Sequence, residues 1–137
     1  MLILDTHTWI WLMTGDEKIK KSGFLMEIEK AAKTNAIKIP AICVWELSML
    51  EAKRRISFNQ NTKDWIISAL SAPGIGLLPL TPEIAYESAH LPGDFHGDPA
   101  DRIIVASSRI SEGMLLTFDK KILEYAKEGY VKVLAPQ

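Results

Sequence analysis

Two apolar runs, almost the whole chain apart, each stop at an aspartate. The first is Met1-Leu2-Ile3-Leu4, followed by Asp5, and the second is Met114-Leu115-Leu116-Thr117-Phe118, followed by Asp119. A short apolar run without polar alternation is typical of a strand that is buried on both faces, as in a parallel sheet. We therefore expect two central strands, each of which presents a carboxylate where it leaves the core.

Helical patterns separate the short strands along the chain. We expect helices over residues 9–13, 19–34, 41–55, 62–70, 82–90, 98–113 and 119–127, with Gly23 as a possible division of the second. We expect strands over residues 1–4, 37–39, 76–80, 114–118 and 131–134. Strands that alternate with helices indicate a parallel sheet covered on both faces. The expected fold class is α/β, a three-layer α/β/α, Rossmann-like arrangement in which residues 1–137 form one domain.

Composition describes an ordinary globular protein. The chain has 137 residues, 47% of them apolar and 24% charged. No apolar run approaches the roughly 18 residues of a membrane span, and no signal-peptide pattern follows Met1. The single cysteine, Cys43, lies in an apolar stretch and is expected to be a small buried side chain in a cytoplasmic protein.

Net charge limits how the chain could bind nucleic acid. The formal net charge is −1, whereas nucleic-acid binders usually carry a basic excess. Any such binding would have to come from local patches or from cations held at an acidic site. Basic runs at Lys53-Arg54-Arg55 and Lys120-Lys121 could contact phosphates, although a solvated helix end is the commoner meaning of such runs.

Asp5 and Asp119 are expected at the same edge of the sheet. In an open parallel sheet, ligands bind outside the carboxyl ends of the strands, where the strand order reverses. Each aspartate could instead simply cap the helix that follows it. Thr6 and Thr117, beside them, could orient ligands or could serve local backbone groups.

Asp98 and Asp101 open a helix. Asp98 directly precedes Pro99, which is the pattern of an N-cap followed by proline at the first helical position. Asp101 falls at the third helical position, where it could serve as a capping-box acid or point out of the helix end toward a shared site. We therefore interpret Asp98 as a helix cap in preference to a metal ligand. Asp101 is the stronger candidate for the site.

Glu46 is the most informative acid. At 100° per residue it falls between Ile42, Met49 and Leu50, in the apolar arc of its helix. An unpaired carboxylate on a buried stripe costs several kcal/mol, so Glu46 needs a cation, a proton or strong donors. A salt bridge to an arginine is one interpretation, and a metal site is the other.

Carboxylates from separate segments, with no histidine or cysteine cluster, favour a hard cation. Mg²⁺ or Mn²⁺ suits such ligands better than Zn²⁺. The reaction that uses such a site is phosphodiester hydrolysis, in which metal ions neutralise phosphate and activate water. The histidines, His7, His90 and His96, show no metal-ligand spacing, and we assign them no catalytic role. The apolar run from Trp9 to Met13 is wider than one buried face needs, which hints at a protein interface.

Four segments resemble the PIN-domain family, specifically the VapC-type toxins of bacterial and archaeal toxin–antitoxin pairs. They are Leu2-Ile3-Leu4-Asp5-Thr6-His7, Trp45-Glu46-Leu47, the run from Asp98-Pro99-Ala100-Asp101-Arg102 to Ala106, and Leu116-Thr117-Phe118-Asp119. Any one of them is a weak signal, but the four together, in order and well spaced, are specific.

The resemblance implies a PIN-like fold and a Mg²⁺-dependent endoribonuclease. It implies a homodimer that is inhibited by a small antitoxin protein encoded beside it. Asp5, Glu46, Asp101 and Asp119 match the family's four acidic positions, and Asp98 matches an extra acid of one subfamily. The same resemblance leaves two alternatives, an RNA-processing nuclease that is not a toxin and a non-catalytic protein-binding module. An aspartyl-phosphate mechanism is disfavoured, because His7 stands where a second acid would be needed.

Overall fold

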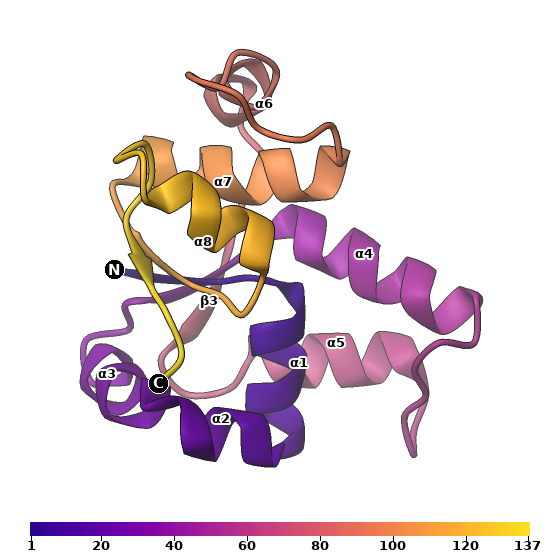
Figure 1. The fold of residues 1–137 in the computed structure, drawn as a ribbon. Helices are drawn as coiled ribbons and strands as arrows, with labels where there is room; N and C mark the ends of the chain where they lie inside the picture. The colour runs from indigo at the N-terminus through magenta and orange to yellow at the C-terminus, as the bar shows by residue number, and fades with distance from the viewer.

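Strands and helices alternate through residues 1–137 of a computed structural model, as Figure 1 shows. The strands are β1 (Leu2–Leu4), β2 (Ile37–Pro40), β3 (Ile75–Leu78), β4 (Met114–Leu116) and β5 (Val133–Leu134). The helices are α1 (Thr6–Thr14), α2 (Glu17–Ser22), α3 (Phe24–Ala32), α4 (Ala41–Ala52), α5 (Thr62–Leu70), α6 (Pro82–Ala89), α7 (Pro99–Ser111) and α8 (Lys120–Ala126).

The five strands form one parallel sheet in the order β3-β2-β1-β4-β5. The chain builds outward from β1 to β3, then crosses back to β4 and continues to β5. Strand order therefore reverses between β1 and β4, whose residues Leu2 and Leu4 pair with Met114 and Leu116. The α/β class with a central parallel sheet is confirmed, and the reversal lies between the two strands that lead to Asp5 and Asp119.

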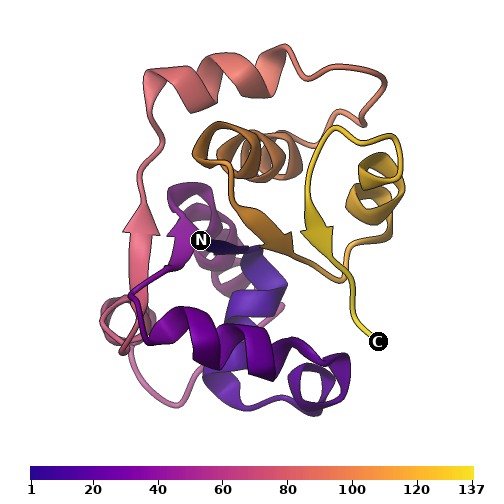
Figure 2. The same cartoon turned by 90° about the vertical axis from the view of Figure 1, so that its left-hand side faces the viewer.

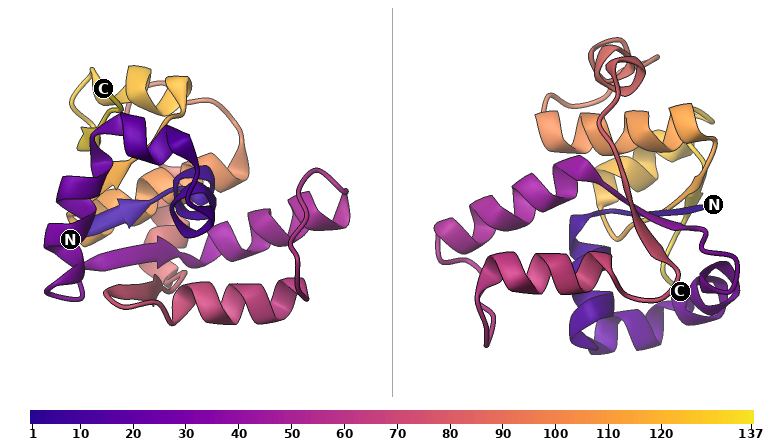
Figure 3. Two further views of the ribbon diagram at one scale, coloured as in Figure 1. Left: turned by 90° about the horizontal axis from the view of Figure 1, so that it is seen from below. Right: turned by 180° about the vertical axis from the view of Figure 1, so that it is seen from behind.

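Helices cover both faces of the sheet. In Figure 1, α7 and α8 lie above the strands and α1, α2, α3 and α5 lie below them, while α6 lies outside α7. The view turned by 90° in Figure 2 shows the same two helical layers with the strands between them. Helix α4 extends sideways from the end of β2 and contacts α1, α5 and α7, as both views of Figure 3 show. The three-layer expectation is confirmed.

The core is centred on β1 and β4. Ile3, Leu4, Leu115 and Leu116 are fully buried, as expected of strands covered on both faces. They belong to one continuous cluster of 24 buried apolar residues. Cys43 is part of that cluster and is a free, buried side chain, as expected. No helix in the chain is both long enough and apolar enough to span a membrane.

The second expected helix divides where the sequence indicated. Gly23 has φ +82°, a left-handed conformation that glycine tolerates and other residues avoid, and it separates α2 from α3. The expectation for residues 41–55 is wrong at its end, because α4 stops at Ala52. Arg54 takes φ +60°, so the Lys53-Arg54-Arg55 run lies beyond the helix.

Capping residues set two of the helix boundaries. Asn61 caps α5, because its side chain accepts a hydrogen bond from the Asp64 backbone N–H. Helix α7 ends at Ser111, two residues before the expected end, and its C-cap Glu112 takes the left-handed conformation with φ +56°. Gly113 serves close packing, since a Cβ there would lie 2.8 Å from the Ile3 side chain.

The apolar run over residues 9–13 packs in part against the core. Trp9 and Ile10 are buried, and Trp11, Leu12 and Met13 are half-buried against the core. Helix α1 lies between the sheet and the neighbouring helices α2 and α4, so more than one of its faces is covered. Core packing therefore accounts for part of this run, and its use as a protein interface stays a prediction.

Candidate active site

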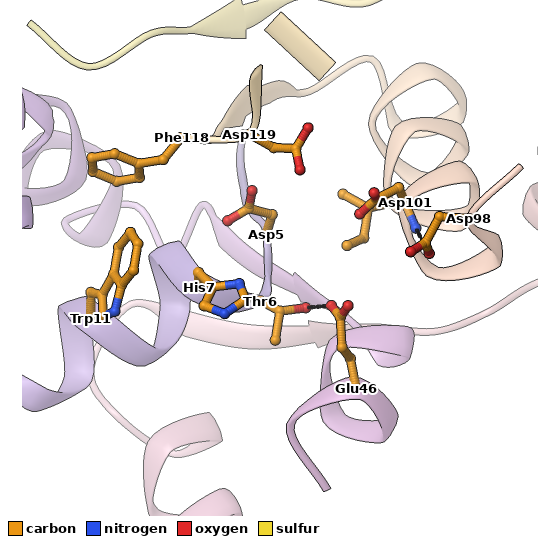
Figure 4. Close-up of a pocket in the computed structure, with 10 residues that line it drawn as sticks. Asp5, Thr6, His7, Trp11, Glu46, Asp98, Asp101, Phe118 and Asp119 are labelled. Atoms are coloured by element: carbon orange, nitrogen blue, oxygen red, sulfur yellow. Dashed lines mark hydrogen bonds between the residues drawn. The ribbon is translucent and has the colours of Figure 1, made fainter. Parts of the chain in front are cut away.

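A cavity of about 430 Å³ opens at the carboxyl ends of β1 and β4. Figure 4 shows the side chains around it, which come from both halves of the chain. The lining residues are Asp5, Thr6, His7, Trp11, Glu46, Asp98, Asp101, Ile104, Phe118 and Asp119. All five carboxylates that the sequence singled out therefore line one cavity, at the place where the strand order reverses.

Asp5 lies at the bottom of this cavity and is only 7% exposed. Its Oδ1 accepts a hydrogen bond from the Thr8 backbone N–H at 3.0 Å, which makes Asp5 the N-cap of α1. Its Oδ2 accepts a hydrogen bond from the Thr117 hydroxyl, 112 residues away. Burial raises the pKa of Asp5, although these hydrogen bonds act in the opposite direction. Capping and a site role are thus compatible at Asp5.

Thr117 joins the two strand ends. While its hydroxyl donates to Asp5, the same oxygen accepts the Asp119 backbone N–H at 3.0 Å. Asp119 in turn caps α8, because its Oδ1 accepts the Ile122 N–H at 3.0 Å. Strand β4 ends at Leu116, so Asp119 stands three residues beyond the strand and not directly at its end as expected.

Glu46 is half-buried, and the expectation that it lies on a buried stripe is wrong. The face of α4 that packs into the core carries Cys43 and Leu47. The partner of Glu46 is the Thr6 hydroxyl, which donates to Oε1. None of the ion pairs in the chain involves Glu46, so the arginine interpretation is also wrong.

Asp98 is the N-cap of α7, as interpreted from the sequence. Its Oδ1 accepts the Asp101 backbone N–H at 3.2 Å. The reciprocal capping-box bond is absent, because the Asp98 N–H donates instead to His96 Nδ1 at 3.4 Å. The Asp101 carboxylate is thereby left to point out of the helix end into the cavity (Figure 4).

Mutual repulsion marks the carboxylates as one electrostatic group. The pKa of Asp101 is raised from 3.8 to about 7, first by burial and then by the nearby charges of Asp98, Asp119, Glu46 and Asp5, in that order. The Asp101 side chain is 18% exposed, so water screens these charges only in part. A partly buried carboxyl group among other acids is costly to ionise, and a nearby cation would lower that cost.

His96 is a contact that sequence reasoning missed. Its Nε2 lies 3.2 Å from Asp101 Oδ2, and both side chains are mostly shielded from solvent. Arg102 fixes the loop that carries His96, because its guanidinium donates to the backbone carbonyls of Ser88, Phe95 and His96. No motif spacing pointed to His96. Its position two residues before an N-cap aspartate was the only available signal.

His7, Trp11 and Phe118 form an aromatic side of the cavity that was also missed. The rings of His7 and Trp11 are 5.5 Å apart, and those of Trp11 and Phe118 are 5.0 Å apart at 81°. Phe118 meets the buried Phe24 ring at 5.2 Å. In the sequence these residues were indistinguishable from core aromatics, because their convergence depends on how α1 and the β4–α8 loop are placed.

The residues of the cavity fit a divalent cation by their chemistry. Carboxylate oxygens are the ligands that Mg²⁺ and Mn²⁺ prefer, and a cation would offset both the burial and the acidic neighbours that raise the pKa of Asp101. No three acidic, histidine or cysteine side chains are close enough, as they stand, to hold one ion between them. Binding would therefore draw the carboxylates together.

Comparison with known proteins agrees with this geometry. The family model described as the PIN domain matches residues 2–128. Among curated proteins, "Ribonuclease VapC22" of Mycobacterium tuberculosis is 27% identical over 121 residues, which cover 88% of this chain and 88% of the relative.

Solved structures share the fold at low sequence identity. VapBC2 from Rickettsia felis, bound to a DNA fragment from its promoter, matches with a TM-score of 0.68 and 14% identity, covering 96% of each chain. A toxin-antitoxin complex from Klebsiella pneumoniae matches with a TM-score of 0.62 and 22% identity, covering 89% of this chain and 90% of that one. These similarities show the fold over 89–96% of the chain.

Proposed function

The chain belongs to the PIN-domain family, and from that premise we propose that it is a metal-dependent endoribonuclease in which residues 1–137 act as one domain. The observation that carries the proposal is the meeting of five carboxylates in one cavity. They come from the end of β1, from α4, from the start of α7 and from the β4–α8 loop. If each acid had only a structural role, the five would have no reason to share a cavity. They also would not need to lie close enough to raise the pKa of Asp101.

We infer that Asp5, Glu46, Asp101 and Asp119 hold Mg²⁺ or Mn²⁺, with Asp98 close by as the cap of α7. A bound cation at such a site neutralises phosphate charge and lowers the pKa of a bound water. The net charge of −1 is then no obstacle, because the cation reverses the sign of the acidic cavity.

The chain's own groups prepare the site by fixing the ligand orientations. Asp5 is held on both oxygens, by Thr117 and by the Thr8 N–H, so its side chain is oriented before anything binds. Thr6 orients Glu46 from the opposite wall. In the reaction we propose, a water oxygen bonds to phosphorus and the bond to the 3′-oxygen breaks, which leaves a 5′-phosphate and a 3′-hydroxyl.

We further propose that the chain is the toxin of a toxin–antitoxin pair. The relative with 27% identity is named a ribonuclease of the VapC type, and similar folds occur in structures described as VapBC and toxin-antitoxin complexes. On this basis we expect an RNA substrate, a small antitoxin partner, a homodimer and a cytoplasmic location.

RNA cleavage with and without Mg²⁺ tests the nuclease activity. Wild-type protein should cut RNA only with Mg²⁺ or Mn²⁺, and Asp5→Asn or Asp101→Asn should each remove the activity. Asp64→Asn is the matched control, because Asp64 is an exposed acid in the first turn of α5, outside the cavity. Activity that survives both site substitutions would show that the assignment is wrong.

Co-expression with the protein encoded by the neighbouring gene tests the toxin role. A small partner that copurifies and suppresses cleavage is the expected result. Metal-dependent cleavage without any such partner would favour the RNA-processing alternative, and metal binding without cleavage would favour a protein-binding module.

A further inference from the structure

The cavity has two chemically different sides. Figure 4 shows Trp11 and Phe118 on one side of Asp5, Asp98 and Asp101 on the other, and His7 between Trp11 and Thr6. We call His7, Trp11 and Phe118 the aromatic wall. The carboxylates account for metal and phosphate, but they give no reason for an aromatic wall beside them.

The aromatic wall is anchored in the core. Phe118 packs edge-to-face on Phe24, which is fully buried, and Trp11 packs edge-to-face on Phe118. Phe118 also lies between Thr117 and Asp119 in the chain, and the Asp119 N–H donates to the Thr117 hydroxyl across it. The same backbone segment therefore fixes the positions of Asp119 and of Phe118. A platform that is rigid before binding loses little conformational entropy when a ligand packs against it.

Part of the wall remains open to the cavity. His7 is exposed and Trp11 is half-buried, while both line the cavity. Core packing explains Phe118 and the inner part of Trp11, but it does not explain an exposed ring at position 7. The Lys18 ammonium lies 4.8 Å from the centre of the Trp11 ring, which adds a positive charge next to the wall.

We propose that the aromatic wall is a nucleobase subsite, in which an unpaired base next to the scissile phosphate stacks against His7 and Trp11. Proteins that read single-stranded RNA stack splayed bases on aromatic side chains, histidine included. A base inside a duplex has its faces covered, so the subsite selects single-stranded or looped RNA. This inference rests on the proposed nuclease function and adds the part of the substrate that the metal site does not contact.

Binding of a nucleotide and of its base-free counterpart tests the subsite without relying on cleavage. Calorimetry in the presence of Mg²⁺ would compare adenosine 5′-monophosphate with ribose 5-phosphate, which keeps the phosphate and sugar but has no base. Wild-type protein should bind the nucleotide between about 5-fold and 150-fold more tightly, the range that one stacked base contributes.

Variants of the wall should remove this difference. His7→Ala removes an exposed ring, and Trp11→Leu removes the larger ring while it keeps an apolar side chain against Phe118. Both should bring the nucleotide affinity close to that of ribose 5-phosphate, while Trp11→Phe should keep most of the preference. Trp45→Ala is the control, because Trp45 is 54% exposed on α4, next to Glu46, yet does not line the cavity.

Two results would overturn the subsite. Equal binding of nucleotide and ribose phosphate by wild-type protein would do so, and it is the result expected if the wall instead receives a side chain of a protein partner. A preference that is unchanged in both His7→Ala and Trp11→Leu would place the base elsewhere. If wild-type protein nevertheless cuts RNA with Mg²⁺, only the subsite proposal is wrong. If wild-type protein shows no Mg²⁺-dependent cleavage, the nuclease proposal itself is wrong.

Discussion

The two sides of the acidic site are built differently. The strand side consists of Asp5, Thr117 and Asp119, which follow β1 and β4, and the helix side consists of Glu46, Asp98 and Asp101 on α4 and α7. On the strand side, the buried hydrogen bond from Thr117 to Asp5 joins the ends of β1 and β4, and Thr117 also accepts the Asp119 N–H.

The helix side is more open and less constrained. Glu46 and Asp101 are half-buried, Asp98 is exposed, and a loop held by Arg102 supports the start of α7. One side of the site is therefore held by the sheet, whereas the other is held by helix ends and a loop. We expect a cation to draw the helix side toward the strand side.

Removal of the Arg102 side chain should produce the largest loss of stability. Arg102→Ala leaves three carbonyls without a charged donor, those of Ser88, Phe95 and His96. Each charge-assisted bond contributes about 1.5–3 kcal/mol, and partial replacement by water suggests a total loss of about 3 kcal/mol. Urea unfolding would measure it, with Arg54→Ala, an exposed arginine beyond α4, as the control. A loss no larger than that of the control would mean that the loop does not depend on Arg102.

Asp101 should make the metal-free protein less stable at higher pH. Its pKa is about 7 in the folded chain and lies near 3.8 in the unfolded chain. The folded state therefore binds the Asp101 carboxyl proton more tightly than the unfolded state does. The stability that this proton contributes is complete below about pH 4 and is lost as pH rises through about 7.

Asp101→Asn removes the cost of ionising a partly buried carboxyl group. The substitution should stabilise the metal-free protein at pH 8 by on the order of 2 kcal/mol. Thermal unfolding in EDTA at pH 5 and pH 8 measures the effect, and Asp64→Asn should show no such change. Mg²⁺ should reverse the order at pH 8, because a bound cation favours the ionised wild-type carboxylate. A stability difference that is the same at both pH values would contradict the raised pKa.

A matched pair of hydroxyl deletions compares the two sides directly. Thr117→Val leaves the buried Asp5 oxygen without its donor and the Asp119 N–H without its acceptor. Thr6→Val removes a single bond to the half-buried Glu46. We expect losses of about 2 kcal/mol and about 1 kcal/mol, measured by urea unfolding in EDTA. Equal losses would show that the strand side is no more tightly constrained than the helix side.

The smallest effect concerns the helix cap. Asp98→Asn keeps an N-cap side chain, so the free energy of unfolding should change by no more than about 0.5 kcal/mol, whereas Asp98→Ala should cost about 1 kcal/mol. Cleavage should follow the same order if Asp98 acts through the cap. A large loss of cleavage in Asp98→Asn, with stability unchanged, would instead make Asp98 a metal ligand.

The sequence predicted the strand side better than the helix side. An apolar run that stops at a carboxylate reflects local burial, so β1, β4 and the edge they share could be inferred. The bond between Thr117 and Asp5 could not, because it joins residues 112 positions apart.

On the helix side, periodicity was a poorer guide. A helical wheel shows which residues share a face but not which face is covered, so the arc of Ile42, Glu46, Met49 and Leu50 was expected to be buried, whereas the buried face is that of Cys43 and Leu47. Tertiary placement alone brings Trp11 to the cavity and His96 to Asp101. Neither residue had a sequence signal that separates it from an ordinary surface or core position.

Calorimetry of Mn²⁺ binding tests most directly whether the two sides form one metal site. Wild-type protein should bind Mn²⁺ at pH 7.5, and Asp5→Asn on the strand side and Asp101→Asn on the helix side should each abolish that binding, while Asp64→Asn should leave it unchanged. Full Mn²⁺ affinity in either site variant would contradict the account, because the carboxylates of the two sides would then not share an ion.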